Sequence, residues 1–154
     1  NDNGLVIDIF PDARKSCDKF STIKSANFLP YSMAAQYAKE NKLNDCLVLN
    51  AAGNIADSTI ANIFIVKDDV VITPALEEGC INGVMRRYLL EQFQTYDIIF
   101  KEGKLDINDL KTANEVFLTN AINGIRWVRQ FVDKSYTNAK TVEIYNRFIK
   151  TIHA

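Results

Sequence analysis

A hairpin pattern occupies residues 62–73, which read Asn62-Ile63-Phe64-Ile65-Val66-Lys67-Asp68-Asp69-Val70-Val71-Ile72-Thr73. Two runs of β-branched and aromatic residues enclose three polar residues, and this arrangement is typical of two strands joined by a tight turn. Pro74 follows at once and ends the second strand, because proline cannot donate a hydrogen bond to a sheet. The segment therefore predicts a buried antiparallel pair of strands in the middle of the chain.

Further strands and helices are expected on both sides of this hairpin. Apolar runs predict strands at 5–10, 20–23, 46–49, 96–100, 115–119 and 125–131. Helical spacing or capping predicts helices from Pro30, over 84–93, at 106–110 and within 138–152. The polar residues 11–19 are expected to form a loop. Since no repeat or linker interrupts the chain, we predict one mixed α/β domain over residues 1–154, with its helices set apart from its strands.

Composition excludes several classes of protein. The chain has 154 residues, of which 47% are hydrophobic and 24% charged, as in a packed globular domain. Its 18 Lys and Arg residues against 19 Asp and Glu residues leave a net charge of −1, which argues against a nucleic-acid partner. No apolar run approaches the roughly 20 residues that span a bilayer, so no membrane segment is expected. No signal peptide is expected from the first residues of this sequence.

Cysteine and histidine usage narrows the possible chemistry. Cys17, Cys46 and Cys80 are far apart and form no CxxC pair, which argues against a disulfide framework or a zinc site. This pattern is typical of a reducing cytoplasm, where we expect the protein to be located. His153 is the single histidine, so neither a Ser-His-Asp triad nor a two-histidine metal site is expected. Any reaction is therefore expected to depend on Lys, a carboxylate, Tyr, Cys or a cofactor.

Two charged residues are candidates for such chemistry. Lys24 ends the predicted strand 20–23, where an apolar wall could favour the neutral amine that Schiff-base formation needs. Asp57 lies between a predicted turn and a buried strand, where a fixed carboxylate could pair with a heteroaromatic nitrogen. Taken alone, Lys24 also fits an exposed surface lysine and Asp57 also fits a turn cap.

Two loops are candidates for ligand binding. Residues 79–86 read Gly79-Cys80-Ile81-Asn82-Gly83-Val84-Met85-Arg86 and precede a predicted helix, whose free N–H groups favour a phosphate. Residues 118–124 place polar side chains at the end of a predicted strand. A plain loop-to-helix junction and an ordinary surface loop remain the alternatives.

Together these segments resemble the signature of the class IV, or fold-type IV, pyridoxal-phosphate-dependent aminotransferase family. The signature comprises an acidic residue, small residues, Asn with an aromatic, a hairpin ending in Thr, and an apolar-X-Gly-apolar-X-basic segment. The matching positions here are Asp57, 62–64, 71–73 and 81–86, and residues 24–31 resemble the segment around the family's Schiff-base lysine. The family usually has Glu where this chain has Asp57. The resemblance covers about residues 18 to 130.

The resemblance implies a fold, a cofactor and roles for seven residues. The fold would be the C-terminal cofactor-binding domain of the D-amino-acid aminotransferase-like fold, a barrel-like and mostly antiparallel sheet with segregated helices. The cofactor would be pyridoxal 5′-phosphate. Lys24 would attach the cofactor, Asp57 would hold its ring nitrogen, and Ile81 would pack on the ring. The N–H groups of Val84 and Met85 would hold the phosphate. Asn120 and Ala121 would contact the phosphate and the substrate carboxylate.

The resemblance also implies partners. The family's chains carry another domain before the Schiff-base lysine, whereas only 23 residues precede Lys24 here. We therefore expect a longer enzyme with an N-terminal domain, a homodimeric assembly and a small-molecule amino substrate.

Three positions favour one reaction within the family. At these positions the chain has Ala61, Asn82 and Asn120. Each of the three resembles the residue of 4-amino-4-deoxychorismate lyases more than that of branched-chain aminotransferases. They favour a lyase that forms 4-aminobenzoate and pyruvate for folate synthesis. Transamination of branched-chain or D-amino acids with 2-oxoglutarate remains the first alternative, and a non-catalytic domain that retains the fold is the second.

Overall fold

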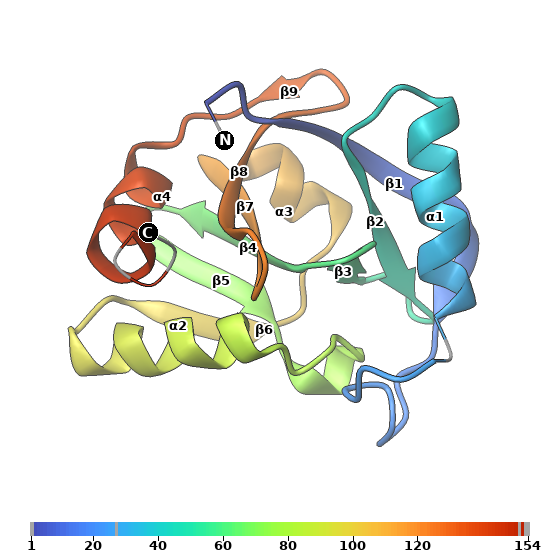
Figure 1. Ribbon diagram of the computed structural model, residues 1–154, viewed down its shortest axis with the longest axis horizontal. Coiled ribbons are helices and arrows are strands. Elements are labelled where there is room, and N and C mark those ends of the chain that lie inside the picture. The colour runs from blue at the N-terminus through green and yellow to red at the C-terminus, as the bar shows by residue number, and fades with distance from the viewer. Residues whose placement is uncertain (1, 27, 151, 153–154) are drawn as a thin grey trace.

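The fold is a curved sheet surrounded by helices (Figure 1). The computed structural model describes residues 2–26, 28–150 and 152 of the chain. Over these residues the nine strands are β1 (Leu5–Lys15), β2 (Asp45–Asn50), β3 (Ile55–Ser58), β4 (Asn62–Lys67), β5 (Val70–Pro74), β6 (Phe100–Gly103), β7 (Glu115–Asn120), β8 (Gly124–Phe131) and β9 (Lys134–Ser135). The helices are α1 (Leu29–Glu40), α2 (Val84–Thr95), α3 (Ile107–Thr112) and α4 (Ala139–Ile144), with a 3₁₀ turn at Leu76–Glu78 and a π-helical turn at Tyr145–Ile149.

The strand order is β3-β2-β1-β8-β7-β4-β5-β6, with β9 paired to β8. The pairs β2–β3, β4–β5, β4–β7, β7–β8 and β8–β9 are antiparallel, whereas β1–β2, β1–β8 and β5–β6 are parallel. The predicted mixed and mostly antiparallel sheet is thus confirmed. The predicted hairpin is β4–β5, and both Asp68 and Asp69 in its turn have positive φ, as a turn that follows the sheet's twist requires.

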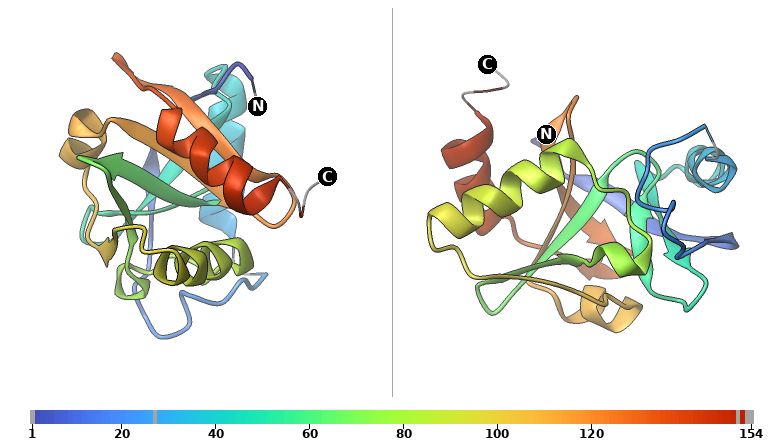
Figure 2. Two further views of the ribbon diagram at one scale, coloured as in Figure 1. Left: turned by 90° about the vertical axis from the view of Figure 1, so that its left-hand side faces the viewer. Right: turned by 90° about the horizontal axis from the view of Figure 1, so that it is seen from below.

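The sheet is buried on both faces, and β4 shows why. Ile63 and Ile65 point into the core that also contains residues of β1, β2 and α3. Phe64 and Val66 alternate with them and pack with α2 and α4 on the opposite face. Figure 2 shows α2 and α4 on one side of the sheet. None of the helices in the described part of the chain is long and apolar enough to cross a bilayer.

Three local predictions from the sequence are wrong. Residues 11–15 continue β1 as a strand, because β1 passes a register shift between Ile9 and Arg14 and pairs again with β2. Residues 20–23 form a turn instead of a strand. The strand expected at 96–100 begins only at Phe100 and extends to Gly103, where it pairs with β5. In each case pairing with a distant strand, or its absence, overrides the local pattern.

Strand β2 lies between β1 and β3 and brings residues from the ends of these two strands close together. Lys15 at the end of β1 pairs with Asn50 of β2, and Val48 of β2 pairs with Asp57 of β3. Helix α1 packs on β1 and β2 and covers the same region, with Tyr31, Ala34 and Ala38 buried. The strands β1, β2 and β3 and the helix α1 lie together in one part of the molecule (Figure 1), so side chains from β1, β3 and α1 can meet near Asp57.

Candidate active site

A buried carboxylate lies at the centre of the site. Asp57 is only 2% exposed. Its Oδ1 accepts a hydrogen bond from the side-chain amide of Asn62 at 2.9 Å, and its Oδ2 accepts one from the Tyr31 hydroxyl at 2.8 Å. The backbone N–H of Ile81 also donates to Oδ2, at 3.0 Å. Donors from three directions hold the carboxylate in one orientation.

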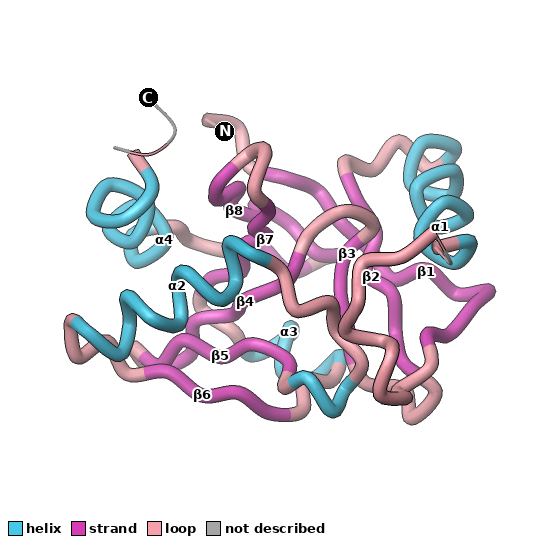
Figure 3. Tube along the Cα trace, turned by 60° about the horizontal axis from the view of Figure 1, so that its bottom comes forward, coloured by secondary structure: helices cyan, strands magenta, loops and turns pink. Residues whose placement is uncertain are grey.

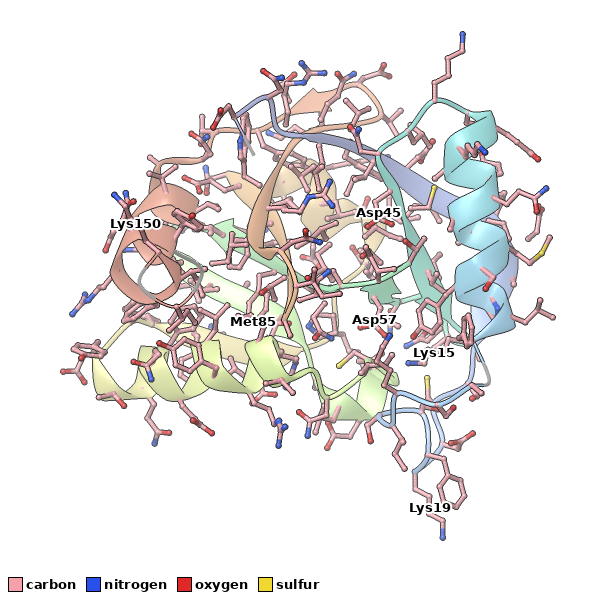
Figure 4. All side chains as sticks on the ribbon, in the orientation of Figure 1. Lys15, Lys19, Asp45, Asp57, Met85 and Lys150 are labelled. Carbon is pink, nitrogen blue, oxygen red and sulfur yellow. The ribbon has the colours of Figure 1, made fainter. Side chains whose placement is uncertain are left out.

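Lys15 is the charged partner of this carboxylate. Its Nζ lies 3.2 Å from Asp57 Oδ2, and its side chain is 11% exposed. Figure 4 shows the two side chains next to each other, one from the end of β1 and the other from β3. Burial raises the pKa of the Asp57 carboxyl, and the positive charge of Lys15 opposes that rise. The ion pair therefore favours an ionised Asp57 in a buried position.

The other titratable groups beside Asp57 are neutral near neutral pH. Burial and the charge of Asp57 both raise the pKa of the Tyr31 hydroxyl. The same two causes, burial first, raise the pKa of the Cys80 thiol to about 12. Arg86, which opposes the rise at Cys80, is itself paired with Glu102. Among these neighbours Lys15 is the one that supplies positive charge directly to Asp57.

The N-terminus of α2 is open to an anion. Gly83 is the N-cap and no side chain caps the helix. Val84 is 64% exposed, whereas Met85 is buried against the core. The first N–H groups of a helix have no partner within it, and the dipole of this 12-residue helix adds partial positive charge there. The N–H groups of Val84 and Met85 are therefore placed to favour a phosphate.

Asn62 connects the carboxylate to the start of this helix. Its side-chain amide donates to Asp57 and also, at 2.7 Å, to the backbone carbonyl of Ile81. Both backbone groups of Ile81 are thus used in the site, while its half-buried side chain packs with the cluster around Tyr31 and Phe10. Its predicted contact with a cofactor ring stays a prediction. The hydrogen bonds nevertheless place the carboxylate and the helix N-terminus beside each other.

The predicted loop at Asn120 and Ala121 lies next to Asn62. Asn62 pairs with Thr119 across β4 and β7, so the residues that follow Thr119 continue along the same edge. The Asn120 Oδ1 accepts hydrogen bonds from the backbone N–H groups of Ile122 and Asn123, at 3.0 and 2.7 Å. Asn120 therefore shapes the turn, and the contacts predicted for it and for exposed Ala121 remain predictions.

Lys24 lies in an exposed loop between β1 and α1. Its exposure agrees with the surface lysine that the sequence alone favoured, whereas the strand predicted before it is wrong. The loop is nevertheless tied to the site, because the carbonyl of Thr22 accepts a hydrogen bond from the N–H of Asn82 at 2.9 Å. Figure 3 shows this loop running beside the segment that leads into α2. The attachment role of Lys24 stays a prediction, and Asn27 and His153 lie outside the described residues.

Sequence reasoning missed two residues of the site. Tyr31 lies in the helix predicted from Pro30 and has no role among the predicted site residues, yet its hydroxyl reaches Asp57. Lys15 lies in a charged segment expected to be a loop, and no local signal distinguishes it from the lysines nearby. Its role depends on the extension of β1 past Pro11, which requires pairing with β2.

The donor set fits pyridoxal phosphate, the cofactor that the sequence resemblance implies. A buried carboxylate suits a protonated ring nitrogen, and an uncapped helix N-terminus suits a phosphate. Asn62 and Ile81 hold these two groups beside each other. A lysine on the adjoining loop, Lys24, is available to an aldehyde.

Replacing Gly83 with alanine should weaken binding of pyridoxal phosphate by about tenfold, within the cost of overpacking a close contact. A Cβ built on Gly83 lies 2.2 Å from Asn62 Oδ1, so Asn62 or the start of α2 has to move. The φ of −64° at Gly83 suits any residue, so the effect is steric. Gly103→Ala is the matched control, because its Cβ meets nothing within 4 Å. Equal affinities of both variants and the parent, measured by equilibrium titration, would contradict the prediction.

Comparisons with known proteins agree with this arrangement. The family model for amino-transferase class IV matches residues 7–131. An aminodeoxychorismate lyase of Vibrio harveyi is 36% identical over 81 residues, which are 53% of this chain and 30% of the relative. The mitochondrial branched-chain-amino-acid aminotransferase 1 of Arabidopsis thaliana is 30% identical over 112 residues, 71% of this chain and 29% of the relative.

Solved structures share the fold. The 4-amino-4-deoxychorismate lyase of Pseudomonas aeruginosa matches with a TM-score of 0.90 and 21% identity, over 99% of this chain and 57% of that one. A branched-chain aminotransferase of Thermoproteus uzoniensis matches with a TM-score of 0.89 and 22% identity, over 97% of this chain and 52% of that one. This chain therefore spans about half the length of the structures and about a third of the curated relatives that it matches.

Proposed function

Because the chain belongs to the amino-transferase class IV family, we propose that it is the cofactor-binding part of a longer pyridoxal-phosphate enzyme, a 4-amino-4-deoxychorismate lyase. This full-length enzyme carries a further domain before the present chain and releases 4-aminobenzoate and pyruvate. The proposal depends above all on one observation: Asn62 and Ile81 hold the buried Asp57 carboxylate beside the open N-terminus of α2.

Each residue of the site has one task in this reaction. Pyridoxal phosphate, the cofactor, supplies the electron sink when it is bound. Asp57 would keep the ring nitrogen protonated, and the N–H groups of Val84 and Met85 would hold the phosphate. Lys24 would attach the cofactor. The amine of Lys24 would also take the proton from the amino-bearing carbon of the substrate and help deliver one to the departing enolpyruvyl group.

Local features support the lyase over the transaminase. Ala61, Asn82 and Asn120 occupy the three positions at which the sequence resembles the lyases. In the structure the side chain of Asn120 shapes the loop beside Asn62, whereas Asn82 contacts the Lys24 loop through its backbone N–H, a contact that does not depend on its side chain. The identity to the Vibrio lyase, 36%, also exceeds the 30% to the Arabidopsis aminotransferase.

A branched-chain aminotransferase is the second candidate function. Its supporting observation is the longer match to the Arabidopsis aminotransferase, 71% of this chain against 53% for the Vibrio lyase. The same carboxylate, helix N-terminus and lysine serve transamination equally well, because both reactions begin by removing a proton from the amino-bearing carbon.

We expect the full-length enzyme to release 4-aminobenzoate from 4-amino-4-deoxychorismate at least about tenfold faster than it transaminates leucine with 2-oxoglutarate, an energetic difference of ~1.4 kcal/mol. Chromatography of 4-aminobenzoate and a coupled assay of glutamate measure the two rates on one preparation. Brisk leucine turnover without 4-aminobenzoate would replace the lyase by the transaminase.

The exposed apolar residues around the site suggest what covers it. Phe20, Ile23, Phe28 and Leu29 on the Lys24 loop and α1 are each more than half exposed, and Ile122 beside Ala121 is 85% exposed. Exposed apolar groups are often covered by a partner. We propose that the preceding domain and a second subunit of a homodimer cover them, and that this enzyme is cytoplasmic, where its free cysteines stay reduced.

A further inference from the structure

Two lysines adjoin the site, and their surroundings differ. Lys24 lies on an exposed loop, whereas the side chain of Lys15 is 11% exposed and its ammonium lies 3.2 Å from Asp57 Oδ2. The same ammonium lies 5.3 Å from the centre of the Tyr31 ring. Lys15 has no task in the reaction described above. Its position on the carboxylate that should receive the ring nitrogen needs an explanation.

Four donors use the Asp57 carboxylate, and one of them, the Ile81 N–H, is shared between its two oxygens. Oδ1 accepts from Asn62 at 2.9 Å and from the Ile81 N–H at 3.3 Å. Oδ2 accepts from Tyr31 at 2.8 Å, from the Ile81 N–H at 3.0 Å and from Lys15 at 3.2 Å. A carboxylate offers about four lone-pair sites. A ring N–H can therefore reach Asp57 only if one of these donors leaves.

Lys15 is the donor that can leave. Asn62 is held by the Ile81 carbonyl, the Ile81 N–H belongs to the backbone, and Tyr31 is buried within the packed face of α1. Lys15 makes the longest contact to Oδ2, ends a flexible four-carbon chain and keeps some access to water. Its ammonium can move to solvent without breaking the strand pairing that holds its backbone.

Charge balance also favours one cation at a time beside Asp57, either the Lys15 ammonium or the protonated ring nitrogen. An unpaired carboxylate in this buried position would be costly, and Lys15 supplies the compensating charge. A protonated ring nitrogen supplies the same charge at the same oxygen. Since the nearby Tyr31 and Cys80 are neutral near neutral pH, both cations together would leave the site with an excess positive charge.

We propose that Lys15 is the exchangeable counter-ion of Asp57: it neutralises the carboxylate in the empty site and moves off Oδ2 when the protonated ring nitrogen of the cofactor binds. This inference rests on the proposed function. It assigns Lys15 a positioning role, separate from the attachment role of Lys24. The ring nitrogen and the aldehyde lie on opposite sides of the pyridine ring, so an amine at Asp57 is at the wrong end of the ring to be attached.

Binding of 4′-deoxypyridoxine 5′-phosphate to the full-length enzyme tests the exchange. This cofactor analogue lacks the aldehyde, so its affinity depends neither on Lys24 attachment nor on turnover. Lys15→Met keeps the length of the side chain and removes its charge. At an alkaline pH, where Asp57 is ionised in both proteins, we expect the analogue to bind this variant about tenfold more tightly than the parent, because no ion pair has to break. Lys19→Met, a charge removal in the same segment whose ammonium contacts Phe20, should leave the affinity unchanged.

Proton release gives a second readout that a purely structural role would not change. In the parent, the charge of Lys15 opposes the rise that burial causes in the pKa of Asp57, so near neutral pH the analogue should release fewer protons on binding than it does in Lys15→Met. In Lys15→Met burial raises the pKa of Asp57 with no cation to oppose it, so the arriving ring should expel about one proton. Calorimetric titrations in buffers of different ionisation enthalpy measure both the affinity and the protons. Lys15→Arg retains the charge and should behave like the parent.

The outcomes separate the exchange from the proposed function. Weaker or unchanged binding to Lys15→Met would overturn the exchange, since Lys15 would then support the bound ring or play no part. If the analogue instead binds more tightly to Tyr31→Phe, then Tyr31 is the donor that leaves Asp57. This result would also overturn the exchange at Lys15. If the parent enzyme itself does not bind the analogue, the proposed function fails together with the inference that depends on it.

Discussion

Replacing Lys24 with alanine should lower turnover by the full-length enzyme roughly 10³-fold or more, the scale of a lost acid–base group. Lys24 is the one residue proposed both to attach the cofactor and to move protons at the reacting carbon. It is exposed in this chain, and the Thr22–Asn82 hydrogen bond keeps its loop beside α2. The measurement is 4-aminobenzoate release, supported by borohydride reduction and peptide mapping, which should find the reduced cofactor on Lys24 alone.

Lys19→Ala is the matched control for this experiment, because it removes an exposed lysine from the same loop. It should retain nearly full activity. Turnover above trace in Lys24→Ala, or reduced cofactor on Lys15, would refute the assignment. An inactive parent that neither turns yellow with cofactor nor yields a reduced adduct would instead support the non-catalytic alternative.

Replacing Asp57 with asparagine should weaken pyridoxal phosphate binding roughly 10- to 100-fold, as expected when a charge-assisted hydrogen bond is lost. Turnover should fall further, because the ring nitrogen is no longer kept protonated. Asparagine retains the shape of the side chain but leaves the Lys15 ammonium without its counter-ion, so Lys15 now repels the ring. Absorbance titration of the cofactor and 4-aminobenzoate release measure the two effects.

Asp45→Asn is the control for losing a buried carboxylate away from the cofactor. Asp45 is 4% exposed and accepts hydrogen bonds from Thr59, so its loss should lower stability without changing cofactor affinity. If Asp57→Asn binds cofactor and turns over like the parent, Asp57 is only a structural residue of β3.

The pKa of Asp57 also sets a pH dependence. Only the ionised carboxylate can hold a protonated ring nitrogen, and burial raises the pKa of Asp57 above its ordinary value. Cofactor affinity should therefore decline as the pH falls, beginning above the usual titration range of an aspartate. In Asp57→Asn this acid decline should be absent.

Local sequence patterns were sufficient for much of the fold and part of the site. Alternating apolar residues and the Asp68–Asp69 turn specify the β4–β5 hairpin, and Gly83 with the helical spacing after it specifies the start of α2. These features depend on neighbours within a few residues, where steric preferences and periodicity act directly. The resemblance to a known family then supplied the expected roles of Asp57 and Lys24.

The electrostatics of the site could not be predicted from the sequence. Lys15 and Asp57 are 42 positions apart, and they meet because β1 passes a register shift, pairs again with β2, and β2 pairs with β3. Tyr31 reaches the same carboxylate only because α1 packs over these strands. Residue types and spacing therefore predict which groups are present, whereas strand pairing and helix packing between distant segments determine which lysine neutralises Asp57 and which remains exposed.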